Sequence, residues 1–121
     1  MWIFTQHGLL SIVKQNPKML AVRAREEKTL RAIFPEFEND IYFDAKGDYR
    51  YKLFIPRRFV GKKIRALVEG IDYDNFKESI GDRGYHNVLL LIWGAFKRYA
   101  EGYKKVKPKQ GELWGQKDYW W

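Results

Sequence analysis

The sequence predicts an α+β domain built on an antiparallel sheet, ferredoxin-like with an extra N-terminal hairpin, whose helices pack on one face. The first observation is a set of short apolar, β-branched and aromatic runs separated by turn signals. The second is the presence of later segments whose apolar residues follow helical spacing. The third is their order of strand, strand, strand, helix, strand, strand, helix, helix. That order suits an antiparallel sheet better than a parallel α/β fold.

Five runs are predicted to be strands. The side chains from Tyr49 to Ile55 alternate, so Arg50, Lys52 and Phe54 share one face of that strand. If helices cover the opposite face, the open face also carries Arg23 and Arg25. The predicted strands are residues 2–5, 9–14, 19–25, 41–44 and 49–55.

Three helices are predicted. The first begins at Glu26 and Glu27 and ends before Pro35. The second covers about 58–70, and the third, a long C-terminal helix, covers roughly 85–103. We expect these side chains to face the core: Leu30, Ile33 and Phe34 in the first helix; Val60, Ile64, Leu67 and Val68 in the second; Val88, Leu89, Ile92, Phe96 and Tyr99 in the third.

The length of 121 residues predicts one domain with its own hydrophobic core. We assign residues 1–107 to that domain and residues 108–121 to a C-terminal tail rich in Trp. The N-terminus has no basic segment followed by an apolar run, and the longest apolar stretch is too short to span a bilayer. We therefore expect a cytoplasmic protein without a membrane partner.

The net charge of +8 is unevenly distributed. Residues 50–65 contain seven Lys or Arg and no acid, and residues 97–109 contain six against Glu101. The rest of the chain is net negative. Such concentrated positive charge favours a phosphate-bearing partner, because long-range attraction and counterion release both increase with local charge. The alternative is a solvated surface that serves solubility.

Several kinds of catalytic and metal site are excluded or disfavoured by the residues present. The chain has no Cys, and its two histidines, His7 and His86, form no metal-binding motif. It contains no phosphate-binding Gly-rich loop and no nucleophile elbow. Asp72 and Asp74 flank a Tyr in a pattern more typical of a turn than of an acid/base pair. We therefore expect a non-enzymatic protein with no cofactor and no metal; the alternative is an enzyme that acts on nucleotides through Asp72, Asp74 or His86.

The preferred ligand-binding stretch is the basic strand and the helix start that follows it, with Arg50, Lys52, Arg57 and Arg58. Tyr49, Tyr51 and Phe54 lie among these cations, and aromatic rings stack on nucleic-acid bases. The alternative places Tyr49 and Tyr51 in the core and leaves the cations facing water.

Two further segments contain candidate ligand-binding residues. Tyr73 and Asn75 lie in a polar loop, where they either contact a ligand or hold the turn. Arg83, Tyr85 and His86 begin the long helix, whose free N–H groups favour an anion. The alternative there is a capped helix start with Asp82 as the N-cap.

Four segments together resemble an uncharacterised family of small bacterial and phage proteins. They are Met1 to Thr5 with Gly8 following, Asp48 to Tyr51, Ile71 to Lys77, and Tyr85 to Val88. The similarity extends from Met1 to about Tyr99 and excludes the tail. The resemblance implies no catalytic residues, because no activity is established for that family. It does imply a mobile-element context, in which one role is phage counter-defence, either by binding a host effector or by sequestering a signalling nucleotide. A phage-encoded protein of this kind is expected in the host cytoplasm.

The sequence thus predicts a binding protein for an anionic ligand, either a small nucleotide or a nucleic acid. A small nucleotide predicts a concave pocket with convergent residues such as Arg50, Tyr73, Arg83 and His86. A nucleic acid predicts a long positive stripe. The alternative function is a protein-interaction or inhibitor module that docks on an acidic host protein. The Trp-rich tail would then contact that protein or join copies of the chain into a homo-oligomer.

Overall fold

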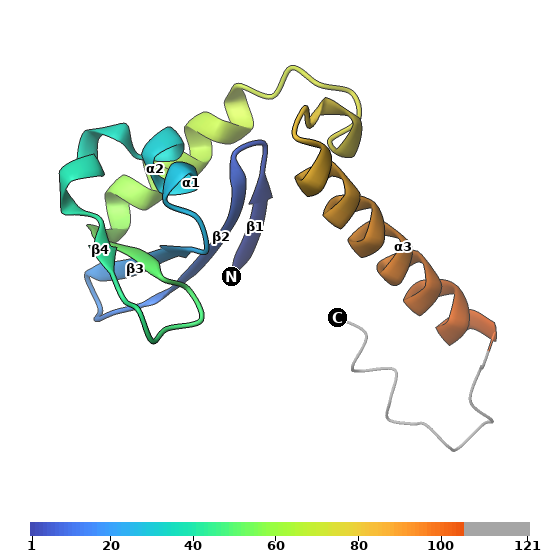
Figure 1. Ribbon diagram of the computed structural model, residues 1–121, viewed down its shortest axis with the longest axis horizontal. Coiled ribbons are helices and arrows are strands. Elements are labelled where there is room, and N and C mark those ends of the chain that lie inside the picture. Colours follow the sequence, from blue (N-terminus) through green and yellow to red (C-terminus); the bar gives the residue numbers. More distant parts are fainter. Residues whose placement is uncertain (106–121) are drawn as a thin grey trace. The chain divides into compact units, whose positions relative to one another are not determined.

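The computed structural model describes residues 1–105, so the predicted tail lies outside the described residues. Its contacts divide the chain into two compact units, residues 1–79 and a second unit that begins at Ile80. The fold class is confirmed: the chain is α+β with a five-stranded antiparallel sheet and a long C-terminal helix (Figure 1). No helix in the described part of the chain is long and apolar enough to cross a membrane.

The first unit contains all five strands, in the spatial order β1-β2-β3-β5-β4. Every neighbouring pair is antiparallel. The strands are β1 (Trp2–Thr5), β2 (Gly8–Lys14), β3 (Met19–Ala24), β4 (Tyr42–Phe43) and β5 (Tyr51–Pro56). Each lies within one or two residues of its predicted position at either end, because alternation and turn residues mark short strands well.

The strand order explains the ferredoxin-like character of the sheet. β3 and β4 are both antiparallel to β5, which lies between them, and helix α1 (Glu27–Ile33) connects β3 to β4. This is a split β-α-β unit. β2 lies on the other side of β3, and β1 extends the hairpin to the edge. The predicted N-terminal hairpin is therefore part of the sheet.

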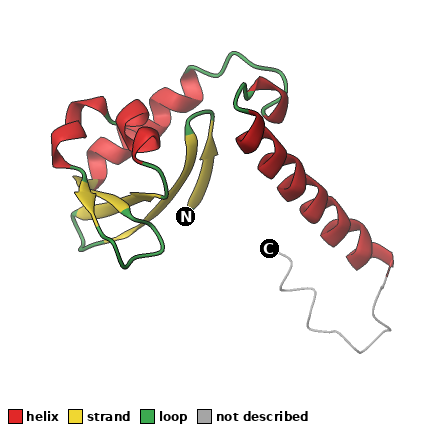
Figure 2. Cartoon of the chain, viewed as in Figure 1, coloured by secondary structure: helices red, strands yellow, loops and turns green. Residues whose placement is uncertain are grey.

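Helices α1 and α2 (Arg57–Glu69) lie on the same side of the sheet (Figure 2). α2 begins directly after β5, where Pro56 ends the strand. Between α1 and β4 the chain forms a 3-10 helix, Pro35–Asp40, where the sequence predicts only the end of the first helix. The buried core combines residues of β2, β3 and β5 with residues of both helices: Leu10, Ile12, Val22, Ala24, Leu30, Ile33, Phe34, Leu53, Ile55 and Val60.

A two-residue turn joins β1 to β2. Thr5 pairs with Gly8, and the Thr5 hydroxyl donates a hydrogen bond to the Gly8 carbonyl oxygen. Gly8 has a φ of 128°, and a Cβ there would collide with the side chain of buried Thr29 in α1. Only glycine satisfies both conditions without strain.

The second unit contains α3 (Arg83–Lys105). Its start is capped, because Asp82 Oδ1 accepts a hydrogen bond from the Tyr85 backbone N–H at 3.0 Å. The predicted buried face of this helix is wrong in part. Leu89 is buried, but Phe96 is 68% exposed and Tyr99 is 64% exposed, and Val88 is exposed as well. A helical period predicts that one face of a helix is apolar, not that every residue of that face is buried.

Candidate functional site

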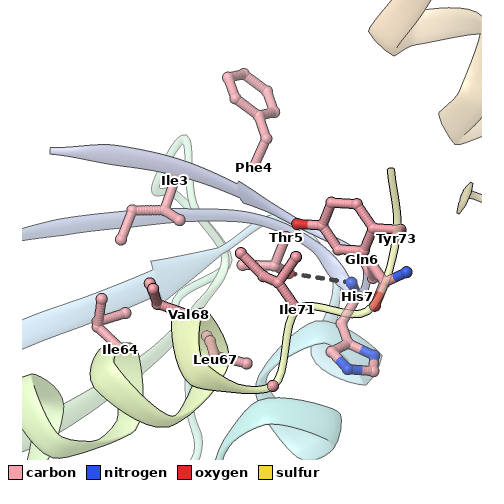
Figure 3. Close-up of a pocket in the computed structure, with 11 residues that line it drawn as sticks. Ile3, Phe4, Thr5, Gln6, His7, Ile64, Leu67, Val68, Ile71 and Tyr73 are labelled. Carbon is pink, nitrogen blue, oxygen red and sulfur yellow. Dashed lines mark hydrogen bonds between the residues drawn. The ribbon is translucent and has the colours of Figure 1, made fainter. Parts of the chain in front are cut away.

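The sheet face opposite α1 and α2 carries rings, cations and small residues. Cross-strand pairing places the alternate residues of each strand there, and Figure 3 shows the Phe4 side chain pointing away from α2. We call this surface the open face. It comprises Trp2, Phe4, Leu9, Ser11, Val13, Ala21, Arg23, Tyr42, Lys52 and Phe54.

One row of the open face crosses all five strands. Trp2 pairs with Ser11, Ser11 with Arg23, Arg23 with Lys52, and Lys52 with Tyr42. Neighbouring strands lie about 4.8 Å apart, so the row is roughly 19 Å long. It therefore has a ring at each end and two cations near its middle.

The Arg23 side chain is held in place by its neighbours. Its Nη2 donates a hydrogen bond of 2.7 Å to Oγ of Ser11. Its guanidinium carbon lies 4.7 Å from the centre of the Tyr49 ring, and that of Arg25 lies 5.1 Å from the same centre, within the range of cation–π attraction. Nε of Arg23 is buried and has no hydrogen-bond partner among the described residues. Arg23 thus has a buried donor left unsatisfied on a side chain that is otherwise anchored.

Lys52 pairs with an acid. Its Nζ donates a hydrogen bond of 2.9 Å to Oδ2 of Asp44, in the loop that joins β4 to β5. This hydrogen bond, with a second from the Lys46 backbone N–H, lowers the pKa of Asp44 below its ordinary value. Asp44 therefore stays ionised and offsets part of the positive charge of the open face.

Three large rings of the open face are available for contact. Trp2 is 66% exposed, Tyr42 is 56% exposed and Phe54 is 44% exposed. Tyr49 is different, because it is buried and its ring already contacts two guanidinium groups. Tyr51 lies on the helix side and packs against the core. The structure therefore fits the alternative in which Tyr49 and Tyr51 are not available to stack on bases. Phe54 is the ring of that segment that is exposed on the open face.

The four cations that the sequence predicts as ligand-binding residues are spread along β5. Arg50 precedes the strand, Lys52 lies on the open face, and Arg57 and Arg58 begin α2 at the other end. Six residues of extended chain span about 20 Å, so these cations form a stripe and not a cluster. Arg57 is partly committed, because its Nε donates a hydrogen bond to the Pro17 carbonyl oxygen at 3.3 Å.

The loop candidates of the first unit have structural contacts. Oδ1 of Asn75 accepts a hydrogen bond from the Glu78 backbone N–H, which stabilises the turn that follows. The Tyr73 ring packs against Phe76 with a centroid separation of 5.7 Å and also lines a pocket beside β1.

Arg83, Tyr85 and His86 lie in the second unit, in the first turns of α3. The Asp82 carboxylate that caps this helix already supplies a negative charge at its N-terminus. Partial burial raises the pKa of Tyr85 to about 12, which keeps its phenol neutral. The structure therefore supports the capping alternative at this helix start more directly than an anion site.

Sequence reasoning missed Trp2, Ser11 and Tyr42 as members of one surface. Alternation places Arg23 and Phe54 on a common face, but the cross-strand register that aligns Trp2 and Tyr42 with them depends on long-range pairing. Within residues 1–105, no group of three His, Asp or Glu side chains is arranged to hold a metal ion.

No family model, curated protein or solved structure matches the chain. The resemblance to small bacterial and phage proteins therefore stays a prediction.

Proposed function

We propose that this protein binds single-stranded nucleic acid on the open face of its sheet. The observation that carries the proposal is the row from Trp2 through Arg23 and Lys52 to Tyr42, which combines exposed rings with cations. Phe54 adds a third exposed ring on the same face. The proposal is one of binding and not of catalysis, since these side chains are rings and cations and include no nucleophile beside a base.

The chemistry of the row suits unpaired bases and a phosphate backbone. Base–aromatic stacking contributes about 1–3 kcal/mol per base, and it requires bases that are free of a duplex. Arg23 and Lys52 supply positive charge on the open face, and Arg25 adds to it because its guanidinium contacts the same Tyr49 ring as Arg23. Sheets that use one open face for both kinds of contact are a common way to bind single-stranded RNA.

A small nucleotide is less well supported. It calls for a concave site with cations around the phosphate, and the pocket beside β1 is lined by no Lys or Arg. The residues proposed to converge on such a nucleotide belong to both units, Arg50 and Tyr73 to the first and Arg83 and His86 to the second. The open face, in contrast, lies wholly within one unit.

Fluorescence anisotropy with labelled single-stranded RNA and single-stranded DNA tests the proposal. We expect binding that weakens steeply as salt increases, and weaker binding to a duplex of the same length. Phe54→Ala removes one stacking ring and should lower affinity by roughly 5- to 150-fold, the equivalent of one stack.

The matched control is Phe59→Ala, which removes a comparably exposed ring from α2 on the other side of the sheet. This change should leave affinity unchanged. Absence of binding to either strand at low salt would refute the proposal. Equal losses for Phe54→Ala and Phe59→Ala would place the binding site elsewhere.

A further inference from the structure

A pocket lies beside β1, between that edge strand and the C-terminal half of α2 (Figure 3). Its volume is about 210 Å³. The walls are mainly apolar: Ile3 contributes from the strand, Ile64, Leu67 and Val68 contribute from the helix, and Ile71 follows the helix. No Asp, Glu, Lys or Arg lines it. All of these residues belong to the first unit.

The pocket marks a place where the core is incomplete. α1 and α2 pack mainly on β2, β3 and β5, so β1 extends beyond the region that the helices cover best. Val68 belongs to the apolar stripe that the sequence predicts for the core, yet it is 61% exposed. Ile3 points toward the helix side and is only partly buried. The apolar layer therefore has an opening at this edge of the sheet.

The hydrogen bonding of the β1 backbone is also incomplete. The Met1 amino group and carbonyl oxygen both form hydrogen bonds of 2.8 Å with Ile12 of β2. In an antiparallel pair such bonded positions alternate with positions whose N–H and C=O face away. Trp2 and Phe4 are the latter kind, so their backbone groups point out of the sheet edge. Within residues 1–105, no strand pairs with that edge.

We propose that the edge of β1 and this pocket together bind an extended peptide segment of a partner protein. The segment adds a strand to the sheet through the backbone groups of Trp2 and Phe4. It also inserts one apolar side chain between β1 and α2. Main-chain hydrogen bonds supply affinity in such a complex, and the pocket supplies specificity.

The chemistry of the site determines the kind of occupant. Only an extended chain presents donors and acceptors at the spacing of Trp2 and Phe4, which excludes a helix as the partner. The pocket favours an uncharged side chain, because a charge placed there would lose its hydration without gaining an ion-pair partner. An apolar cavity of about 150 Å³ accommodates a benzene ring, so leucine, methionine or phenylalanine fits here.

The edge of β1 lacks the side chains that usually keep sheet edges unpaired. It carries no Lys, no Pro and no charged side chain, and its sequence is Trp-Ile-Phe-Thr. Exposed apolar edge strands of this kind readily pair with another chain. The site shares Trp2 and Phe4 with the open face, but it uses their outward backbone groups and a pocket whose α2 residues, Ile64, Leu67 and Val68, lie on the other side of the sheet.

The test uses the full chain and a blocked synthetic peptide of alternating threonine and leucine. Isothermal titration calorimetry should show saturable binding of this peptide to the wild-type chain. Val68→Trp fills the pocket from an exposed position and should weaken binding by about tenfold or more, equivalent to at least 1.4 kcal/mol. Ala66→Trp introduces the same ring at an exposed position of the same helix that does not line the pocket, and it should leave binding unchanged.

Two further arms test the backbone contribution. A peptide that is N-methylated at alternate residues loses the N–H donors along one of its own two edges. It should bind far more weakly than the unmethylated peptide when that edge faces β1. Phe4→Pro removes an outward N–H and leaves the bonds to β2 in place, so it should have the same effect. If Phe4→Pro fails to fold, as judged by circular dichroism, the methylated peptide and Val68→Trp carry the test.

The proposal is overturned if the wild-type chain shows no saturable binding of the peptide. This holds also where the reason is that residues 106–121 or a second copy of the chain occupies the edge. Equal binding by Val68→Trp and Ala66→Trp would also overturn it. Oligonucleotide affinity, measured separately, should be the same for Val68→Trp and the wild type. The peptide site and the nucleic-acid site can therefore fail independently.

Discussion

The guanidinium of Arg23 donates a hydrogen bond to the hydroxyl of Ser11 across the neighbouring strands β3 and β2. The same guanidinium lies over the ring of Tyr49, so two contacts determine its position. A long cationic side chain held in this way loses less conformational entropy when it meets a phosphate. Arg23 is therefore the cation of the open face that we expect to contribute most per charge.

Two substitutions at Arg23 distinguish the contribution of its charge to binding from that of its planar guanidinium group. Arg23→Lys keeps the charge but loses the planar group that reaches Ser11 and Tyr49 together, so affinity for single-stranded RNA should fall while the salt dependence stays the same. Arg23→Gln should lower affinity further and reduce the slope of log affinity against log salt by about 0.7. Anisotropy titrations over a series of salt concentrations measure both quantities. Identical slopes for the two variants would argue against a phosphate contact by Arg23.

Neutralising Asp44 should strengthen binding. Asp44 pairs with Lys52 on the open face, and Asp44→Asn removes a negative charge that a phosphate must approach. The interaction of two unit charges at about 4 Å in water is about 1 kcal/mol, so the gain should be at most about fivefold. The control is Glu69→Gln, which changes net charge equally but affects the pair with Arg65 on α2. A gain of the same size in both variants would indicate a general charge effect and not one local to the open face.

Two carboxylates make the free energy of unfolding depend on pH in the acid range. A hydrogen bond from Lys52 lowers the pKa of Asp44, and one from Lys63 lowers the pKa of Glu36. A carboxylate with a lowered pKa in the folded state contributes stability above its unfolded pKa, and that contribution is lost as pH falls through the folded value. Urea unfolding should therefore show declining stability below the ordinary values of 3.8 for Asp and 4.5 for Glu.

The double variant Asp44→Asn with Glu36→Gln provides the comparison for that pH dependence. Its stability should decline less steeply than that of the wild type over the same pH range, because the two groups no longer titrate. An equal decline in both proteins would mean that other carboxylates account for the acid sensitivity.

Gly8 should be essential to the hairpin of β1 and β2. Gly8→Ala forces a Cβ onto a residue with a φ of 128° and against Thr29, so the free energy of unfolding should fall by about 1–3 kcal/mol or more. Gly61→Ala is the matched control, because a Cβ at this position in α2 meets nothing within 4 Å. That change should raise stability by about 0.5–1 kcal/mol, since Ala favours a helix more than Gly does. Urea unfolding curves of the two variants would contradict this account if Gly8→Ala were neutral.

The local pattern of the sequence predicted most of the secondary structure. Alternation from Met19 and from Tyr49, with turn residues between the runs, located the strands to within two residues, and the apolar spacing of Leu30 and Ile33 located α1. These features depend on residues close together in the chain, so they can be inferred without knowledge of the tertiary structure. The order of the elements then suggested the antiparallel sheet.

The functional surface was only partly predictable. Arg23, Lys52 and Phe54 were assigned to one face, but Trp2 and Tyr42 join them only through pairings between distant strands. Tyr49 lies outside β5, where alternation no longer applies, and its ring reaches Arg23. The exposure of Val68 and Phe96 depends on which elements cover each helix, and a helical pattern alone carries no such information.

The most direct test of the open face is an NMR titration of the nitrogen-15-labelled protein with a single-stranded oligouridine. The resonances to follow are the Arg23 Nε–H and the Trp2 indole N–H, with the Arg65 Nε–H on α2 as the reference. We predict that the Arg23 and Trp2 signals shift together and saturate while the Arg65 signal does not move. Unchanged Arg23 and Trp2 signals at saturating oligonucleotide, or a shift confined to Arg65, would contradict the assignment of this face as the nucleic-acid site.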